Sequence, residues 1–171
     1  SWEGSCSLSA DGKVLYFASD RDGGHGGRDI YKAELLENET WGNVQNLGKN
    51  INTVYNDDAP FIHPDNQTLY FSSQGHTSVG GYDVFSSVMD DYGTFGTPKN
   101  LGYPINTIDD NRYFVLAANG KTGYYSADGK TSLGGQDIYK VLLKDEYEKL
   151  AVLKGVVYGE NEETPLSAKI T

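Results

Sequence analysis

The chain alternates short apolar runs with polar, glycine-rich segments. Val14–Ser19 is an apolar and aromatic run, and residues 23, 24, 26 and 27 after it are all glycine. From 29 to 35 the side chains alternate between two faces, with Tyr31 and Leu35 on one and Lys32 on the other, which is the period of a strand. A six-residue apolar run fits a strand buried on both faces, and glycine adopts positive φ at little steric cost. We therefore predict two strands, Val14–Ser19 and one that opens at Asp29, joined by a sharply turning glycine-rich loop.

This strand–loop–strand unit recurs with a period of 54 residues and without a gap, as Tyr16, Tyr70 and Tyr124 show. A fixed period of this length indicates an array of one supersecondary unit. The same spacing relates the Gly-Gly pairs that begin at Gly26, Gly80 and Gly134, the aspartates Asp29, Asp83 and Asp137, the pair Trp41 and Phe95, and the segments Ile51–Thr53 and Ile105–Thr107.

Each repeat divides into four strands. The dipeptides Asp-Gly, Asp-Asn and Asn-Gly between the first and second strands have hairpin-turn chemistry. Four antiparallel strands in a unit of roughly 40–50 residues form the blade of a β-propeller. We therefore predict an all-β chain of β-propeller-type blades, three four-stranded repeats at 1–54, 55–108 and 109–148 that make an incomplete propeller. The first strands are predicted at Ser5–Ala10, Ala59–Pro64 and Tyr113–Ala118, the second at Val14–Ser19, Thr68–Ser73 and Thr122–Ala127, the third from each repeated aspartate onward, and a short fourth near Val44–Leu47.

Composition narrows the class of protein further. The 171 residues include 13 Tyr and 21 Gly, which suits an aromatic, turn-rich β-protein. The formal charge of −10 repels phosphate backbones, so nucleic acid is not an expected partner. Cys6 is the only cysteine, which excludes an intrachain disulfide, and no apolar run reaches the length of about 20 residues that a membrane-spanning helix needs.

The repeated motifs resemble a known family. The sequence S-A-D-G-K-V-L-Y-F-A-S-D-R from Ser9, followed by G-G-R-D-I-Y from Gly26, resembles the WD-repeat-like unit of TolB-type β-propellers. The second copy, together with P-K-N-L-G-Y-P-I-N-T from Pro98, is similar to the propeller segment of Bacteroidetes envelope proteins that carry a C-terminal OmpA-like domain. The resemblance covers residues 1 to about 144 and extends more weakly to type IX secretion and gliding components. It implies a periplasmic, outer-membrane-associated protein whose peptidoglycan-binding OmpA-like domain is absent from this sequence.

The C-terminal residues depart from the repeat. Residues 149–171 alternate apolar and polar side chains around a Gly-Glu-Asn turn and look like the truncated start of a carboxypeptidase-regulatory-like β-sandwich. We expect the chain to be a fragment of a larger propeller. Three blades would leave two open faces of apolar strand surface, and two copies could associate through them.

The repeated Asp29, Asp83 and Asp137 are the first candidates for chemistry. A carboxylate at the end of a glycine loop can accept hydrogen bonds from several loop amides and fix the turn. An identical aspartate in every blade favours this structural role over a single active site. Calcium binding is the alternative, but the spacing does not supply the 6–8 oxygen ligands that calcium needs. We expect no metal and no cofactor.

Acid pairs mark a second candidate region. Asp57-Asp58 and Asp109-Asp110 are predicted to lie in the connections that precede the first strands, at the same end of the blades as the glycine loops and around the mouth of the central channel. Such a face suits a partner surface, while solvated loop acids are the simpler interpretation. The candidate partner-binding residues are Tyr55, Asp57, Asp58, His76, Tyr82, Asp109, Asp110 and Arg112.

The sequence favours a non-enzymatic interaction scaffold in the bacterial cell envelope. The partner would be an envelope protein or a cell-wall component, and an acid-rich face would favour cationic partners, with binding that weakens as salt rises. The alternative is an enzyme, either a propeller glycosidase or lyase or the gating propeller of a peptidase. One cluster of polar residues that does not repeat between blades and converges on the channel would favour that alternative.

Overall fold

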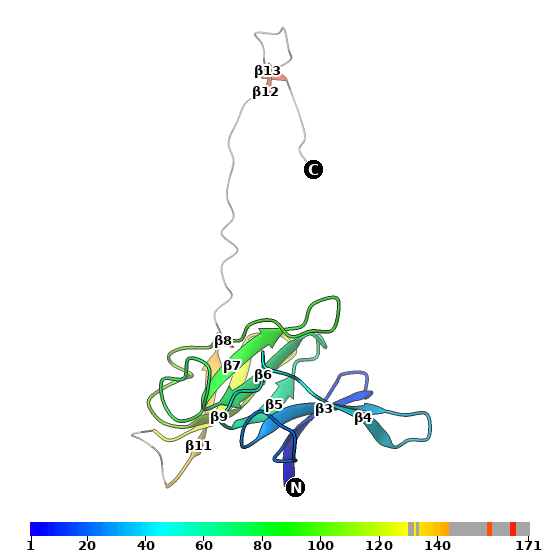
Figure 1. Ribbon diagram of the computed structural model, residues 1–171. Coiled ribbons are helices and arrows are strands. Elements are labelled where there is room, and N and C mark those ends of the chain that lie inside the picture. Colours follow the sequence, from blue (N-terminus) through cyan, green and yellow to red (C-terminus); the bar gives the residue numbers. More distant parts are fainter. Residues whose placement is uncertain (130–131, 133, 144–156, 159–164, 167–171) are drawn as a thin grey trace.

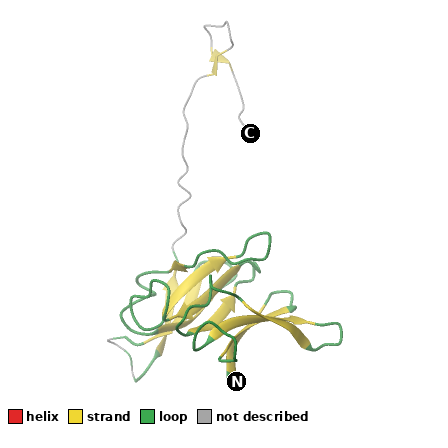
Figure 2. Ribbon diagram, in the orientation of Figure 1, coloured by secondary structure: helices red, strands yellow, loops and turns green. Residues whose placement is uncertain are grey.

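The computed structural model describes residues 1–129, 132, 134–143, 157–158 and 165–166. Within these residues every regular element is a β-strand (Figure 2). Consecutive strands pair antiparallel in each sheet, as the predicted hairpins require. The first sheet holds β1 (Glu3–Leu8), β2 (Val14–Ser19), β3 (Asp29–Leu35) and β4 (Trp41–Asn46), and the second holds β5 (Asp57–Ile62), β6 (Thr68–Ser73), β7 (Asp83–Val88) and β8 (Lys99–Asn100).

The third sheet has three strands within the described residues, β9 (Asn111–Leu116), β10 (Thr122–Ala127) and β11 (Asp137–Leu142). Two further short strands, β12 (Val157–Tyr158) and β13 (Pro165–Leu166), pair with each other antiparallel. Most of 149–171 lies outside the described residues, so the β-sandwich assigned to this segment stays a prediction.

The three sheets lie side by side, with the second between the first and the third (Figure 1). The first strand of each sheet lies innermost, since β5 contacts both β1 and β9. The last strands lie outermost, because β4 contacts only β3 and β8 contacts only β7 among the described strands. This is the arrangement of propeller blades around an axis and confirms the predicted fold class.

The strand bounds follow the sequence pattern closely where a strand is apolar. The second strands have the predicted bounds in all three repeats, and the third strands open at the repeated aspartates. The first strands begin two residues earlier than predicted, because polar residues such as Asp57 already pair with the neighbouring strand. The fourth strand of the first sheet also begins earlier, at Trp41, whereas that of the second sheet is only two residues long.

Each innermost strand carries an irregularity at the same repeat position. The register shifts between Gly4 and Ser7 in β1, and the shift recurs one repeat and two repeats later. Ser5, Ala59 and Tyr113 lie at these shifts with φ of 49°, 51° and 57°, in the left-handed region that L-residues rarely adopt. The three bulged segments, residues 5–7, 59–61 and 113–115, line a hollow of about 140 Å³ between the innermost strands.

The apolar core lies between the sheets. In the junction of the first and second sheets, Tyr16 and Ile30 pack with Phe71, Phe85 and Phe95. In the junction of the second and third sheets, the repeat-equivalent Tyr70 and Val84 pack with residues of β9 and β10. The same side of one blade therefore meets the same side of the next in both junctions.

The connection between blades clamps each junction through two asparagines. Asn52 accepts from the backbone N–H of Ile30 at 2.7 Å and donates to its carbonyl at 2.9 Å. Asn106 makes the same two hydrogen bonds with Val84, both at 2.8 Å. The repeated Ile-Asn-Thr segment therefore joins each blade to the preceding one.

The Gly-Gly pairs permit a close approach at these junctions. A Cβ atom on Gly26 would lie 2.6 Å from the carbonyl oxygen of Thr53, and one on Gly80 would lie 2.5 Å from that of Thr107. Both oxygens belong to the backbone, so the glycine loop can contact the connection to the next blade only without a side chain.

Candidate interaction site at the ends of the innermost strands

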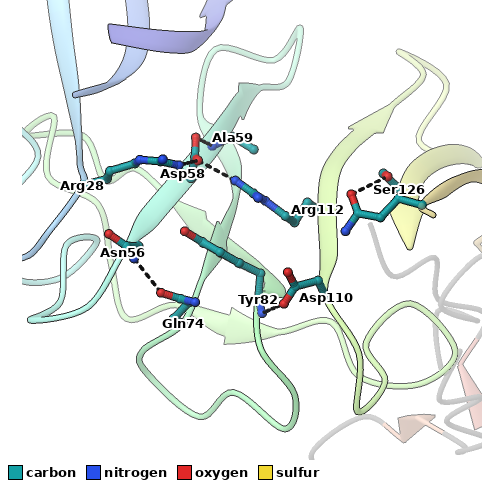
Figure 3. A network of polar contacts seen from close by, with 10 residues as sticks. Arg28, Asn56, Asp58, Ala59, Gln74, Tyr82, Asp110, Arg112 and Ser126 are labelled. Atoms are coloured by element: carbon teal, nitrogen blue, oxygen red, sulfur yellow. Dashed lines mark hydrogen bonds and ion pairs between the residues drawn. The ribbon is translucent and has the colours of Figure 1, made fainter. Parts of the chain in front are cut away.

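One buried carboxylate joins the three blades. Asp58, the second residue of β5, has no exposed surface, and its Oδ2 accepts from Arg28 Nη1 at 2.8 Å and from Arg112 Nη2 at 2.6 Å (Figure 3). Its Oδ1 accepts from the backbone N–H of Ala59 at 2.7 Å. Arg28 belongs to the first blade, Asp58 to the second and Arg112 to the third, so we call these three residues the inter-blade cluster.

Both arginines of the inter-blade cluster also stack on aromatic rings. The Arg112 guanidinium lies 4.1 Å from the centre of the Tyr82 ring, and that of Arg28 lies 4.4 Å from the Trp2 ring. Such contacts stabilise a cation that has lost part of its hydration. The Arg28 side chain is 37% exposed and that of Arg112 is 17% exposed. The Nε of Arg112 is buried and has no hydrogen-bond partner within the part of the chain that the structure describes.

Tyr82 borders the inter-blade cluster next to Arg112. Its backbone N–H donates to Asp110 Oδ1 at 2.9 Å, and its ring lies beside Arg112 (Figure 3). Burial raises the pKa of Tyr82 above its usual value, and the positive charge of Arg112 opposes that rise in part. The hydroxyl therefore stays protonated at neutral pH, which suits a hydrogen-bond donor and not a general base.

The inter-blade cluster arises where the repeats differ. Arg28 aligns with Tyr82 in the next repeat, and Asp58 aligns with Gly4 and Arg112. Our sequence interpretation singled out Asp58 and Arg112 but missed Arg28, because it searched for residues that repeat. Charged residues at positions that vary between otherwise similar repeats are the signal that would have found it.

The prediction that Asp57 and Asp58 lie in a loop facing solvent is wrong. Both belong to β5 and are fully buried. Asp57 accepts hydrogen bonds from the backbone N–H and hydroxyl of Thr53 and from the Ser73 hydroxyl. Burial raises its pKa, and these hydrogen bonds oppose the rise. Its hydrogen bonds are those of a structural residue that fixes the start of the strand.

The other candidate residues fall into two groups. Tyr55 and Asp109 are exposed, and Asp110 is half-buried beside Tyr82, so these three can meet a partner. His76 is directed elsewhere, because its ring contacts Phe71 and Phe85 and its Nε2 lies 3.0 Å from the carbonyl oxygen of Ile51. The structure therefore groups Asp58, Tyr82, Asp110 and Arg112 and separates Asp57 and His76 from them.

The loop aspartates at the start of the third strands make repeated hydrogen bonds. Asp29 accepts from the N–H groups of His25 at 2.6 Å and Gly26 at 2.9 Å, and from Asn46 Nδ2 at 2.7 Å. Asp83 accepts from the equivalent N–H groups and from Asn100 Nδ2. Both carboxylates thus accept hydrogen bonds from the N–H groups of their own glycine loops and from an asparagine side chain of the fourth strand. Asp137 opens β11 and is half-buried.

The inter-blade cluster is suited to binding an anionic or polar group. It has two permanently charged guanidinium groups and one carboxylate, and that carboxylate already accepts hydrogen bonds on both oxygens. Glycoside hydrolysis needs two carboxyl groups about 5–9 Å apart with complementary roles. The inter-blade cluster is thus a polar cluster that does not repeat between blades, yet its groups are those of recognition and not of acid–base chemistry.

The architecture is that of a β-propeller, and solved structures identify its type. The chain is similar to TolB from Acinetobacter baumannii, with 19% identity and a TM-score of 0.56 over 80% of this chain and 29% of that one. It is also similar to a putative TolB from Agrobacterium tumefaciens, with 14% identity and a TM-score of 0.53 over 80% of this chain and 48% of that one. The blades are therefore of the TolB-type β-propeller fold, and the chain spans less than half the length of either TolB protein.

Other comparisons add little about function. The tricorn protease matches with a TM-score of 0.41 and 14% identity, covering 80% of this chain and 12% of that one, which is too distant to bear on activity. No family model matches the chain, and no curated protein matches it significantly. Among the residues that the structure describes, no helix has the length and apolar character to cross a membrane.

Proposed function

We propose that this chain is a non-enzymatic protein-interaction scaffold of the bacterial cell envelope. In this proposal the blades hold the inter-blade cluster rigidly, and a partner docks around it. The observation that carries the proposal is that Arg28 of the first blade and Arg112 of the third both donate to Asp58 of the second, each through one nitrogen among the contacts of the described residues. Asp110, which accepts from the backbone N–H of Tyr82, and the exposed Tyr55 and Asp109, which precede Asp58 and Arg112 by three residues, would supply an aromatic and acidic rim.

We further propose that the chain belongs to a larger, OmpA-like protein associated with the outer membrane on its periplasmic side. The motif resemblance to Bacteroidetes envelope proteins supports this assignment, and a role in type IX secretion or gliding follows from the same resemblance. The partner is then an envelope protein or a cell-wall component. Burial of Asp57 and Asp58 leaves a mixed surface of both charges, so the partner presents a carboxylate to the arginines and a cationic group to the rim, and binding weakens as salt rises.

Site-specific photo-crosslinking tests this proposal. A photo-reactive residue replaces Tyr55 or Asp109, and Tyr92 in the turn between β7 and β8, which is 93% exposed against 59% for Tyr55, serves as a control that is no less accessible. The probes are an envelope extract of Bacteroidetes cells and purified peptidoglycan sacculi. We expect the same discrete product from the first two positions, none from Tyr92, and loss of that product at high salt.

The outcomes separate the possibilities. Equal labelling from all three positions, or labelling that salt does not affect, would contradict a partner surface at the inter-blade cluster. Co-sedimentation with sacculi assigns the partner to the cell wall, and a protein adduct assigns it to the envelope proteins. Turnover of polysaccharide or peptide substrates by the purified chain would favour the enzymatic alternative.

A further inference from the structure

Every junction between blades brings together two different faces. The first face carries the positions of Tyr16 and Ile30 in the first blade, and we call it the key. The second carries the positions of Phe71, Phe85 and Phe95 in the second blade, and we call it the seat. Tyr16 meets Phe95 edge-on, with ring centres 6.2 Å apart. The key of one blade fills the seat of the next in both junctions of the chain.

The key of the third blade is uncovered. Tyr124 and Ile138 occupy the positions of Tyr16 and Ile30, and Ile138 is 82% exposed whereas Ile30 is fully buried. Tyr113 and Val115 extend the same exposed surface, and together with Tyr124 and Ile138 they border a hollow of about 380 Å³. The side chains that are covered in the first blade are thus present in the third with nothing packed on them within the described residues.

The seat of the first blade is exposed at Leu8 and Trp41, whereas Phe17 and Tyr31 between them are already buried. Trp41 is 43% exposed, while its equivalent Phe95 is 5% exposed beneath Tyr16. A hollow of about 360 Å³ borders Trp41 and is lined largely by apolar residues such as Leu15, Phe17 and Val44. The complete seat of the second blade, Ile62, Leu69, Phe71, Phe85 and Phe95, corresponds position by position to Leu8, Leu15, Phe17, Tyr31 and Trp41.

The third glycine loop also has room for a following blade. The Cβ of a side chain at Gly27 or Gly81 would collide with Asn56 or Asp110, which belong to the start of the next blade. Gly135 stands at the equivalent position and has open space around it. A residue without a side chain is needed there only when another blade is docked.

We propose that two copies of this chain associate head to tail, with the key of one copy in the seat of the other. The new junction repeats an interface that the chain already forms twice, with Tyr124 against Trp41 of the second copy as Tyr16 lies against Phe95. This inference goes beyond the proposed function and does not depend on it. When both keys and both seats are used, the pair closes into a ring around a common axis.

Arg21 does not prevent this docking. Its guanidinium lies 5.1 Å from the ring centre of Phe17 and 4.9 Å from that of Tyr31, the two buried rings of this seat. In the second blade His76 contacts the equivalent Phe71 and Phe85, at 5.8 and 5.2 Å, and that seat is nevertheless filled. A polar group over this aromatic pair is therefore compatible with a formed junction.

Two single substitutions test the proposal on the full chain. Ile138→Glu places a charge in the key and Trp41→Glu places one in the seat, and Tyr92→Glu changes an exposed aromatic residue outside both faces. Mass is measured by light scattering after gel filtration, with circular dichroism to verify folding. We expect twice 18.7 kDa for the wild type and for Tyr92→Glu, and monomers for the other two variants.

Mixing the two monomeric variants distinguishes head-to-tail pairing from other arrangements. Trp41→Glu retains an intact key and Ile138→Glu retains an intact seat, so an equimolar mixture should regain dimers through one junction. Assemblies longer than a dimer also support head-to-tail pairing if either substitution abolishes them. Head-to-tail contacts that do not close into a ring leave a free key and a free seat, to which further copies can add. Should Trp41→Glu fail to fold, Leu8→Glu alters the same seat.

Several results would overturn the proposal. A wild-type chain that stays monomeric over the accessible concentration range excludes it. A dimer that survives Ile138→Glu or Trp41→Glu excludes it as well. Key-to-key pairing would survive Trp41→Glu and seat-to-seat pairing would survive Ile138→Glu, whereas head-to-tail pairing needs both faces. A mixture that remains monomeric while both variants are folded contradicts it as well.

Discussion

Asp57 and Asp58 are adjacent and fully buried, yet the structure predicts opposite responses to the same substitution. Asp58→Asn should destabilise the chain strongly. The carboxylate accepts from Ala59 on one oxygen and from two arginines on the other, and an amide presents one oxygen and one donor in their place. The NH₂ group of the asparagine must then face either the backbone N–H of Ala59 or the two guanidinium groups.

Removing one partner of a buried ion pair costs about 3–5 kcal/mol. The lower end, about 3 kcal/mol, applies to Asp58→Asn because the Arg28 side chain is 37% exposed and keeps part of its hydration. For a domain of this size the loss corresponds to a fall in melting temperature of roughly 6–12 °C.

Asp57→Asn should leave stability at pH 7 within about 1 kcal/mol of the wild type, on the stabilising side. The third blade already has asparagine at this position, where Asn111 Oδ1 accepts from Thr107 N–H at 2.7 Å as Asp57 accepts from Thr53. Burial raises the pKa of Asp57, so the native state binds its proton more tightly than the unfolded chain does. Ionisation of Asp57 therefore reduces stability above the raised pKa, and this cost shrinks as the pH falls from the raised pKa toward the ordinary value of 3.8 in the unfolded chain.

Urea unfolding at pH 7 and pH 4, monitored by tryptophan fluorescence, measures these differences. Asp109→Asn is the control, because it removes the same charge from an exposed side chain and should change stability by less than about 0.5 kcal/mol. The advantage of Asp57→Asn should shrink toward pH 4. If Asp57→Asn costs as much as Asp58→Asn, the two carboxylates do not differ in the way that their hydrogen-bond partners imply.

Three further substitutions test other features. Ala127→Ser supplies a hydroxyl to the buried Nδ2 of Asn111, which has no partner among the described residues, and should raise the free energy of unfolding by about 1 kcal/mol in urea titrations; a loss of that size contradicts the geometry. Gly80→Ala should lower it by about 2 kcal/mol because a backbone oxygen occupies the space, whereas Gly96→Ala, whose Cβ would lie 3.4 Å from the nearest backbone oxygen, should be nearly neutral; equal effects would exclude a packing cause. Ala59→Val should cost about 2 kcal/mol by thermal melting because a β-branched side chain opposes positive φ, while Ala59→Gly should stay within about 1 kcal/mol; a tolerated valine argues against the bulge.

The sequence predicted the elements that local chemistry determines. The second strands could be bounded to the residue because an apolar run ends at a turn on one side and at a glycine loop on the other. The first strands could not, because Asp57 and Asp58 look like loop residues until their neighbours in β6 are known. Their burial depends on hydrogen bonds from Thr53, Ser73 and two arginines that no local pattern reveals.

The candidate site was predicted only in part for a related reason. A search for repeats finds what the blades share, such as the loop aspartates and the Ile-Asn-Thr connection. The inter-blade cluster instead depends on Arg28, Asp58 and Arg112, which are 30 and 54 residues apart and meet only once the blades are packed. The sequence supplied two of the three residues, and their contact with Arg28 could be seen only in the structure.

The asparagine clamps have a consequence for how such repeats can evolve. Asn52 and Asn106 contact Ile30 and Val84 through hydrogen bonds to main-chain atoms, so these bonds do not depend on the side chain at the position that they hold. A lineage can therefore exchange one side chain for another there, or duplicate a whole unit, without rebuilding the attachment. The hydrogen bonds that join the units thus tolerate different apolar side chains in the buried junction, as Ile30 and Val84 show.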